Sequence, residues 1–157
     1  MDAFEQAFAQ IIGNEGGFTS NQADPGNWTG RERGQGECRG TKFGISARAY
    51  PDLDIANLTL NEAYAIYRRD YWDKLKADEL PGPLALLAFD AAVNNGLGRA
   101  RQWLNLAQKQ SDGAAICAEF QALRLTFMAS LPTWKTFGLG WSRRLCRLPY
   151  EALTMPE

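Results

Sequence analysis

Histidine is absent from this chain of 157 residues, and its absence excludes several classes of catalyst. A serine or cysteine nucleophile that depends on an imidazole base needs a histidine, so Ser-His-Asp and Cys-His mechanisms are excluded. Zinc sites built on histidine are excluded for the same reason. If the chain is a hydrolase, its carboxylates must therefore supply the acid–base chemistry.

Cysteine is scarce as well, with Cys38, Cys117 and Cys146 far apart in the sequence and no CxxC pair. This spacing argues against a structural zinc site, and an odd number of cysteines is typical of reduced thiols. We interpret Cys117 and Cys146 as small buried hydrophobic residues. We expect neither a metal ion nor a cofactor.

The chain also lacks an excess of positive charge and a long apolar run. Its formal net charge is -1, which argues against nucleic acid as a partner because phosphate recognition needs a basic surface. The longest apolar candidate, LPGPLALLAFDAAVNN, is shorter than the roughly 20 residues that span a bilayer and carries Asp90. The N-terminal MDAFEQAFAQ has no basic region followed by an apolar segment, so we expect neither stable membrane insertion nor a signal peptide.

What the sequence does contain is helical periodicity. With 45% apolar and 22% charged residues, it has the composition of one soluble globular domain, which we expect to cover 1–157. Asp2 with Glu5, and Thr59 with Glu62, form capping boxes at two predicted helix starts. The predicted helices cover 2–13, the segment LTLNEAYAIYRRDYWDKL, 83–95, 99–109 and 114–130, and the tail LPTWKTFGLGWSRRLCRL holds two short helical pieces broken at GLG.

Residues 18–47 lack this periodicity and are rich in glycine and polar residues. We predict an irregular lobe there, with a small β-hairpin at 40–47, and a helical body over 58–150. The expected fold class is mainly α, an α+β arrangement with a small polar lobe inserted after the first helix. A lobe opposite a helical body forms a cleft, and ligands usually bind in clefts.

Three residues around this predicted lobe have the chemistry of a glycoside hydrolase. Glu15 closes the first helix, Asp24 lies in a DPG turn, and Thr41 opens the candidate strand TKFGIS. Glycoside hydrolysis uses one carboxylic acid to protonate the leaving oxygen and a second group to activate water or stabilise the oxocarbenium-like centre. We expect partial burial to keep Glu15 protonated and a wetter loop to keep Asp24 charged. A solvated helix end, a plain turn and a plain strand residue are the alternatives.

Several segments carry a family resemblance, in the family's order. The chain resembles glycoside hydrolase family 108, the N-acetylmuramidases found as phage endolysins and bacterial secretion muramidases, in EGGFTSNQADPGNWTG, GTKFGIS, YWDKLKADELPGPLALLAFDAAVNNGLGRA and FGLGWSRRL. The resemblance implies a lysozyme-like fold and cleavage of the β-1,4 bond between N-acetylmuramic acid and N-acetylglucosamine in peptidoglycan. It makes Glu15 the general acid and Asp24 the group that positions or activates water.

The third catalytic position is open between two threonines. Thr29 keeps the family's distance from Asp24, whereas Thr41 keeps the T-x-x-G-I context, and an extra polar stretch at 30–40 separates them. We favour Thr41 as the residue that positions water, because the residues after it fix the strand on which it lies.

Further residues are candidates for substrate binding. Asp90 and Asn94 lie four apart on one helix face with Asn95 beside them, which suits hydrogen bonds to a sugar or its N-acetyl group, or a capped helix end. Aromatic rings suit stacking on sugars, although burial in a core is their more common fate. The aromatic candidates are Trp28, Tyr71, Trp72 and Trp141. The arginines of WSRRLCR are interpreted as a solvated face that attracts phosphate or carboxylate groups of the wall.

The expected partner is a peptidoglycan glycan strand. We expect a monomer, made in the bacterial host cytoplasm without a signal peptide, that reaches periplasmic peptidoglycan through a holin membrane hole or an export device. Two other functions fit the same residues. A lytic transglycosylase also uses one glutamate but forms an anhydro sugar without water, and a non-catalytic wall-binding domain keeps the fold without the chemistry.

Overall fold

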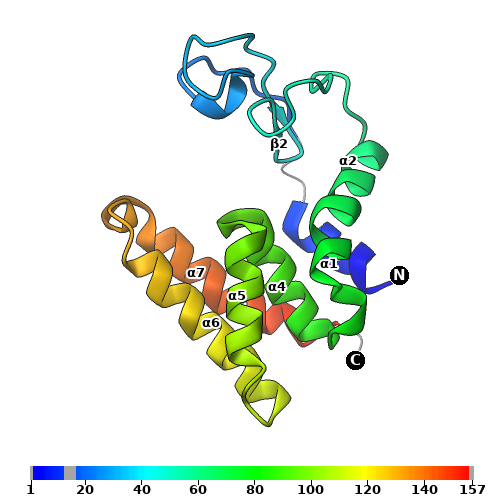
Figure 1. Ribbon diagram of the computed structural model, residues 1–157, viewed down its shortest axis with the longest axis vertical. Helices are drawn as coiled ribbons and strands as arrows, with labels where there is room; N and C mark the ends of the chain where they lie inside the picture. The colour runs from blue at the N-terminus through cyan, green and yellow to red at the C-terminus, as the bar shows by residue number, and fades with distance from the viewer. Residues whose placement is uncertain (1, 13–16, 156–157) are drawn as a thin grey trace. The chain divides into compact units, whose positions relative to one another are not determined.

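The computed structural model describes residues 2–12 and 17–155, whose course is drawn in Figure 1. The chain forms two compact units: the helical unit, residues 1–7 and 68–157, and the lobe unit, residues 8–67. Helices predominate, and the described strands are one short antiparallel pair. This confirms the predicted fold class, a mainly α chain with a small β element after the first helix.

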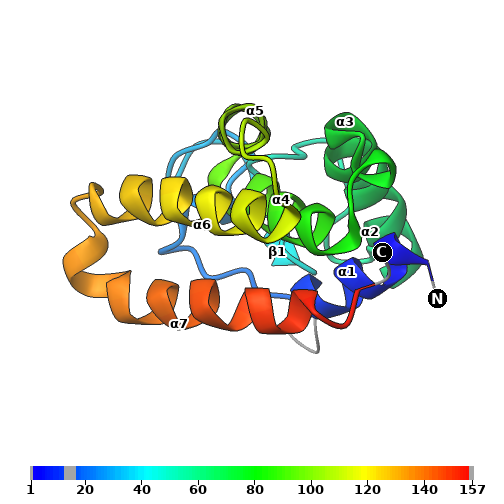
Figure 2. The same ribbon diagram turned by 90° about the horizontal axis from the view of Figure 1, so that it is seen from below.

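The helical unit is built around α4 (Gly82–Asn95), which contacts α5 (Leu97–Ala107), α6 (Gly113–Ala129) and α7 (Trp134–Ala152). Figures 1 and 2 show α6 and α7 running side by side, and the two helices are in contact. From Leu84 to Ala92, every α4 residue is buried. A helix that is apolar all round belongs in the middle of a core, so the predicted helix at 83–95 is confirmed together with its central place in this unit.

A second part of the helical unit is an aromatic cluster. The Phe4 and Trp72 ring centroids are 5.2 Å apart, and Phe89 from α4 lies 5.6 Å from Phe4 and 5.5 Å from Trp72. Trp72 ends a π-helical segment, η2 (Arg68–Trp72), which leads into α3 (Asp73–Leu75) and then η3 (Ala77–Glu79). Its indole Nε1 donates to Asp78 Oδ1 at 2.7 Å, so the ring is enclosed and its one polar atom is satisfied.

The lobe unit contains a short hairpin followed by a helix. Strands β1 (Thr41–Lys42) and β2 (Ile45–Ser46) pair antiparallel, which confirms the predicted hairpin. The two residues between them, Phe43 and Gly44, have φ values of 52° and 75°, as a type I′ turn requires. The Tyr67 hydroxyl of α2 (Leu60–Tyr67) donates to the Phe43 carbonyl at 3.0 Å and lies where a side chain at Gly44 would stand. The turn is therefore fixed by α2, which belongs to the lobe unit rather than to the helical body.

Helix α1 (Ala3–Ile12) contributes residues to both units. Phe4 joins the aromatic cluster of the helical unit, whereas Phe8 packs on Tyr64 of α2 at 5.2 Å in the lobe unit. At its start, Glu5 N donates to Asp2 Oδ1 and Asp2 N donates to Glu5 Oε2, at 2.7 and 2.8 Å. This confirms the predicted capping box, which satisfies backbone N–H groups that the first turn leaves free.

The second predicted capping box, at the start of α2, is also confirmed. The Thr59 N–H donates to Glu62 Oε2 at 2.8 Å, its hydroxyl does so at 2.7 Å, and Glu62 N donates back to Thr59 Oγ1 at 3.2 Å. The backbone and side-chain hydrogen bonds from Thr59 lower the pKa of Glu62. The charged form of this glutamate is therefore the one that caps the helix.

The prediction of two short helical pieces in the tail is wrong. Helix α7 runs without a break from Trp134 to Ala152, through the GLG segment. At Gly138 a Cβ atom would stand 2.7 Å from two ring carbons of Trp134, so the glycine leaves room for the indole against the helix. The packing of Trp134 offsets the poor helix propensity of glycine, which is about 1 kcal/mol below that of alanine.

The interpretation of the cysteines needs one correction. Cys117 is partly exposed and Cys146 is exposed on α7, so Cys146 is not a core residue. Cys38, Cys117 and Cys146 are all free thiols. Burial, and the nearby charge of Asp112, raise the pKa of Cys117. Within residues 2–12 and 17–155, no helix is both long and apolar enough to cross a membrane.

Candidate active site

The predicted proton donor, Glu15, lies outside the described residues, which end at Ile12 and resume at Gly17. The geometry of the candidate site is therefore built from its other predicted members. Asp24, Thr41 and Trp28 lie in the lobe unit, and the remaining candidates lie in the helical unit.

Asp24 opens a single 3₁₀ turn, η1 (Pro25–Asn27). Its Oδ1 accepts a hydrogen bond from the Gly26 N–H at 2.8 Å, which is the Asx turn that an Asp-Pro-Gly sequence favours. The residue is exposed. The turn thus fixes the carboxylate in place while leaving it accessible to water and to a ligand.

The two candidate threonines have different surroundings. Thr41 begins β1, pairs its backbone with Thr19 at 2.8 and 2.9 Å, and donates its hydroxyl to Asn27 Oδ1 at 2.7 Å. Thr29 accepts the Glu37 N–H on its hydroxyl at 2.9 Å, within the extra polar stretch. Thr41 is thus joined to the turn of Asp24, whereas Thr29 braces the inserted loop.

Asn27 is the residue that links the two candidates, and sequence reasoning missed it. It is fully buried. Its amide Nδ2 donates to the Asn21 carbonyl at 2.9 Å, its Oδ1 accepts from Thr41, and its backbone N–H donates to the Asp24 carbonyl at 3.2 Å. Buried polar groups need such partners. The position directly after Pro-Gly was visible in the sequence, but nothing there marked an asparagine as buried.

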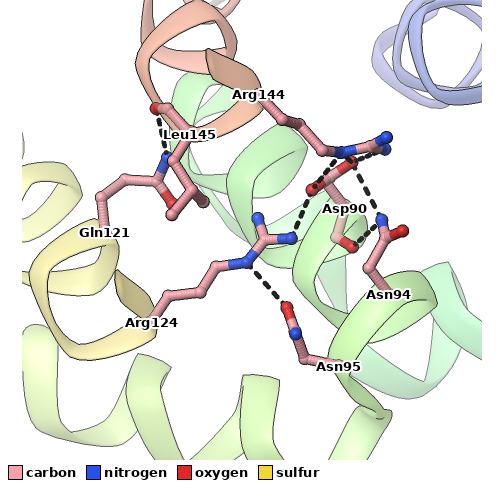
Figure 3. Close-up of polar contacts among 7 residues, drawn as sticks. All are labelled: Asp90, Asn94, Asn95, Gln121, Arg124, Arg144 and Leu145. Atoms are coloured by element: carbon pink, nitrogen blue, oxygen red, sulfur yellow. Dashed lines mark hydrogen bonds and ion pairs between the residues drawn. The ribbon is translucent and has the colours of Figure 1, made fainter. Parts of the chain in front are cut away.

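The helical unit contains a buried charge cluster, drawn in Figure 3. Asp90 and Arg124 are fully buried, with Arg124 Nη2 2.7 Å from Asp90 Oδ2. Arg144 Nε donates to Asp90 Oδ1 at 3.0 Å, and its Nη2 contacts the same oxygen. Arg124 Nε donates to Asn95 Oδ1 at 2.7 Å. Burial lowers the pKa of Arg124, and the charge of Asp90 opposes that shift. The Asp90 carboxylate thus forms ion pairs with the guanidinium groups of both Arg124 and Arg144.

This cluster corrects the interpretation of Asp90 and of one arginine in WSRRLCR. Asp90 is enclosed and engaged by two arginines, so it positions side chains rather than contacting a sugar. The Arg144 guanidinium is bound to Asp90, so it is not an unconstrained side chain on a solvated face. Sequence reasoning missed Arg124 altogether, because its partner lies on another helix.

The two asparagines at the end of α4 differ in accessibility. Asn95 is partly buried and accepts from Arg124. Asn94 is exposed, and its Nδ2 donates to the Asp90 carbonyl at 2.8 Å and to Asp90 Oδ1 at 3.2 Å. Figure 3 shows the Asn94 oxygen turned away from the cluster. Asn94 therefore presents an oriented hydrogen-bond acceptor at the surface.

The aromatic candidates also separate by burial. Trp72 has no exposed surface, so it cannot stack on a sugar, and its role is in the core. Tyr71 and Trp28 are partly exposed. The Trp28 indole donates to the Gln22 carbonyl at 3.1 Å, and this hydrogen bond fixes the ring within the lobe unit. In the sequence, Trp28 follows the Asp24 turn directly.

The lobe unit also contains a pocket of about 440 Å³, lined by Phe18, Cys38, Arg39, Asp52, Asp54, Ile55 and Ala56. Hydrogen bonds from Asn57 lower the pKa of Asp54 on its rim. Among the described residues that line this pocket, neither Asp24 nor Thr41 appears. In the described part of the chain, no three His, Cys, Asp or Glu side chains are grouped in a way that could hold a metal ion.

Comparisons with known proteins extend these observations. The model of the family described as glycosyl hydrolase 108 matches residues 8–96, which is more than half of the chain and includes Glu15, Asp24 and Thr41. The chain is also similar to a solved structure, SagA of Brucella abortus, with 26% sequence identity and a TM-score of 0.77. That similarity covers 97% of this chain and 94% of the SagA chain. No curated protein matches the chain significantly.

Proposed function

Because this chain belongs to the glycosyl hydrolase 108 family, we propose that it is an N-acetylmuramidase that cleaves the β-1,4 bond between N-acetylmuramic acid and N-acetylglucosamine. The family makes the chain a glycoside hydrolase of the peptidoglycan-degrading kind, and its mainly α fold is lysozyme-like. The bond that is cleaved and the roles of individual residues belong to the proposal.

In this proposal Glu15 is the general acid. It protonates the glycosidic oxygen as the bond to the sugar breaks, so that the leaving group departs as a neutral alcohol. Asp24 stabilises the positive charge that develops on the other sugar or activates the attacking water, and Thr41 positions that water. No metal ion or cofactor takes part.

The observation that carries the proposal is the hydrogen-bonded connection through Asn27. It joins the Asp24 turn to the hydroxyl of Thr41, which lies 14 positions after Asn27, within one unit. Catalytic groups must be held in a fixed arrangement to lower a barrier, because a misplaced group loses its advantage. A buried asparagine that contacts both segments supplies such an arrangement for Asp24 and Thr41, the two candidates that follow Glu15 in the sequence.

Substitution of the carboxylates tests these roles. Glu15→Gln should lower kcat on purified sacculi by about 10²–10⁴-fold, the usual contribution of a general acid, while circular dichroism stays that of the parent. Asp24→Asn should also lower kcat, whereas Asp52→Asn, the same change at another exposed carboxylate of the lobe unit, should not. Full activity of Glu15→Gln would overturn the assignment.

The two threonines can be separated in the same assay. Thr41→Val removes the hydroxyl that contacts Asn27, and Thr29→Val removes the one that braces the inserted loop. The proposal expects the larger loss of kcat from Thr41→Val. A larger loss from Thr29→Val would move the third catalytic role to Thr29.

The setting of the activity is also part of the proposal. The enzyme acts on periplasmic peptidoglycan of a Gram-negative host after synthesis in the cytoplasm, as a phage endolysin does once a holin has opened the membrane. Purified protein should clear a suspension of chloroform-permeabilised Gram-negative cells and leave intact cells turbid. Equal clearing of intact cells would contradict the need for a membrane opening.

A further inference from the structure

The N-terminal half of α7 carries three aromatic side chains that the proposed catalytic steps do not use. Trp134, Phe137 and Trp141 follow one another at spacings of three and four, so they share one helix face. The Phe137 and Trp141 rings stack with centroids 5.9 Å apart and an interplanar angle of 29°. Trp134 lies 6.0 Å from Trp141. We call these three residues the aromatic row.

The aromatic row remains in contact with water. Phe137 is 53% exposed, and both tryptophans are partly exposed. Rings that serve only as core are enclosed in this protein, as Phe4, Trp72 and Phe89 are. An exposed apolar patch of adjoining side chains on a soluble protein marks a binding surface more often than a single exposed residue does. The aromatic row therefore has the exposure of a binding surface.

The aromatic row is also held in place. The indole of Trp134 lies against the helix at Gly138, where any side chain would overlap its ring. Trp141 is contacted by the rings of both preceding members of the row, Trp134 and Phe137. Because the rings are ordered before a ligand arrives, little conformational entropy is lost when one binds.

The charge of α7 complements an anionic ligand. The helix carries four basic residues and one acidic residue, which are Lys135, Arg143, Arg144, Arg147 and Glu151. The stem peptides of peptidoglycan carry carboxylate groups, so an excess of positive charge attracts this polymer.

One of these cations is fixed next to the aromatic row. Arg144 follows Trp141 by one helical turn, its side chain is 41% exposed, and Asp90 holds its guanidinium. The Asn94 amide is bound to the same carboxylate and turns its oxygen outward, as Figure 3 shows. Within the helical unit, the aromatic row is thus followed along α7 by a positioned cation, Arg144, whose carboxylate partner also positions the Asn94 oxygen as a hydrogen-bond acceptor.

We propose that the aromatic row and Arg144 bind a peptidoglycan glycan strand through residues other than those that cleave it. The apolar faces of the sugar rings stack on Phe137 and Trp141, and Arg144 attracts a stem-peptide carboxylate. The identity of the polymer rests on the proposed function, whereas the stacked rings and the positive charge are properties of α7 itself. Such a surface keeps the enzyme on its insoluble substrate between cleavage events.

The test measures binding of the full chain to purified sacculi by co-sedimentation, in a Glu15→Gln background so that the substrate is not degraded. Phe137→Ala should weaken binding by about two- to tenfold, the range of one aromatic contact, and Phe137→Tyr should restore it. The matched control is Leu139→Ala. Leu139 is 69% exposed on the same helix, but a spacing of two places it away from Phe137 and Trp141.

Each of these outcomes either supports or overturns binding of the glycan strand by the aromatic row. In the active enzyme, Phe137→Ala should raise KM for sacculi relative to Leu139→Ala, and added salt should weaken binding by both parent and control. Equal binding by Phe137→Ala and Leu139→Ala, with cleavage by the parent intact, would overturn this inference and leave the proposed function standing. Absence of both binding and cleavage by the parent would overturn the proposed function instead. Concentration-dependent self-association that Phe137→Ala abolishes would assign the row to a second copy of the chain and also overturn the inference.

Discussion

The lobe unit holds its candidate residues on short elements tied by hydrogen bonds, whereas the helical unit holds its own on long helices packed around an apolar helix. In the lobe unit, one buried asparagine joins the Asp24 turn to β1. In the helical unit, Asp90 projects from α4, and the residues next to Asp90 on that helix are buried and apolar. The two units thus fix polar side chains in different ways: the lobe unit uses hydrogen bonds between short segments, and the helical unit uses packed helices.

The difference has an energetic meaning. A polar hub such as Asn27 contributes through satisfied hydrogen bonds, each with a modest net effect of about 1 kcal/mol. A buried ion pair contributes little net stability when complete, but removal of one partner leaves a charge in a low-dielectric interior. The helical unit should therefore be more sensitive to a single polar substitution than the lobe unit, and the following variants test that ranking.

The largest loss is expected for Asp90→Ala, which leaves Arg124 buried without its counter-charge. Unfolding in urea should show a loss of about 3–5 kcal/mol. The matched control is the double variant Asp90→Leu with Arg124→Met, which removes both charges and should recover most of the loss, since Arg144 can turn to water. A double variant as unstable as Asp90→Ala would show that packing, not charge, sets the effect.

A smaller loss is expected for Asn27→Ala in the lobe unit. The substitution leaves the Asn21 carbonyl and the Thr41 hydroxyl without their partner, at a cost of about 1–3 kcal/mol. Hydrogen exchange should rise in β1 and η1 and remain unchanged in α4. Asn57→Ala, which removes an exposed asparagine of the same unit bonded to Asp54, is the control and should change neither region as much. Uniform exchange across both units in Asn27→Ala would contradict a local role.

These two residues also show where sequence reasoning ends. Helix α4 and the β1–β2 hairpin were predictable, because apolar periodicity and turn chemistry are local properties. The burial of Asn27 and Arg124 was not, because it depends on partners distant in sequence: Thr41 lies 14 residues from Asn27, and Asn95 lies 29 residues from Arg124. Trp72 and Asp90 were misread for the same reason, since an aromatic or acidic residue at a helical spacing fits a core and a binding surface equally well.

The error at the GLG segment of α7 leads to the next prediction. Gly138→Ala should destabilise the helical unit by about 1–3 kcal/mol, because the new methyl group overlaps the Trp134 ring. Gly140→Ala should do the reverse and stabilise it by about 0.5–1 kcal/mol, since nothing lies within 4 Å of a Cβ there. Thermal unfolding measures both. If the two variants shifted the melting temperature in the same direction, the packing of Trp134 would not explain why position 138 requires a glycine.

The smallest effect concerns the capping box of α2. Because hydrogen bonds from Thr59 lower the pKa of Glu62, the folded state favours the charged form. Its contribution to stability is complete above the unfolded pKa of about 4.3 and is lost as pH falls through the lower folded value. Glu62→Gln should therefore be less stable than the parent at neutral pH, and the difference should vanish in acid. Glu79→Gln, the same change at an exposed position of the helical unit, sets the baseline, and a difference that persisted in acid would contradict this reasoning.

The central claim, that the protein adds water across a peptidoglycan β-1,4 bond, is tested most directly by mass spectrometry of the muropeptides released from purified sacculi in water enriched in heavy oxygen. The account predicts that each released fragment ends in a reducing N-acetylmuramic acid that carries one heavy oxygen atom, and that Glu15→Gln releases none. Fragments that end in anhydro-muramic acid without heavy oxygen would contradict it and identify a lytic transglycosylase.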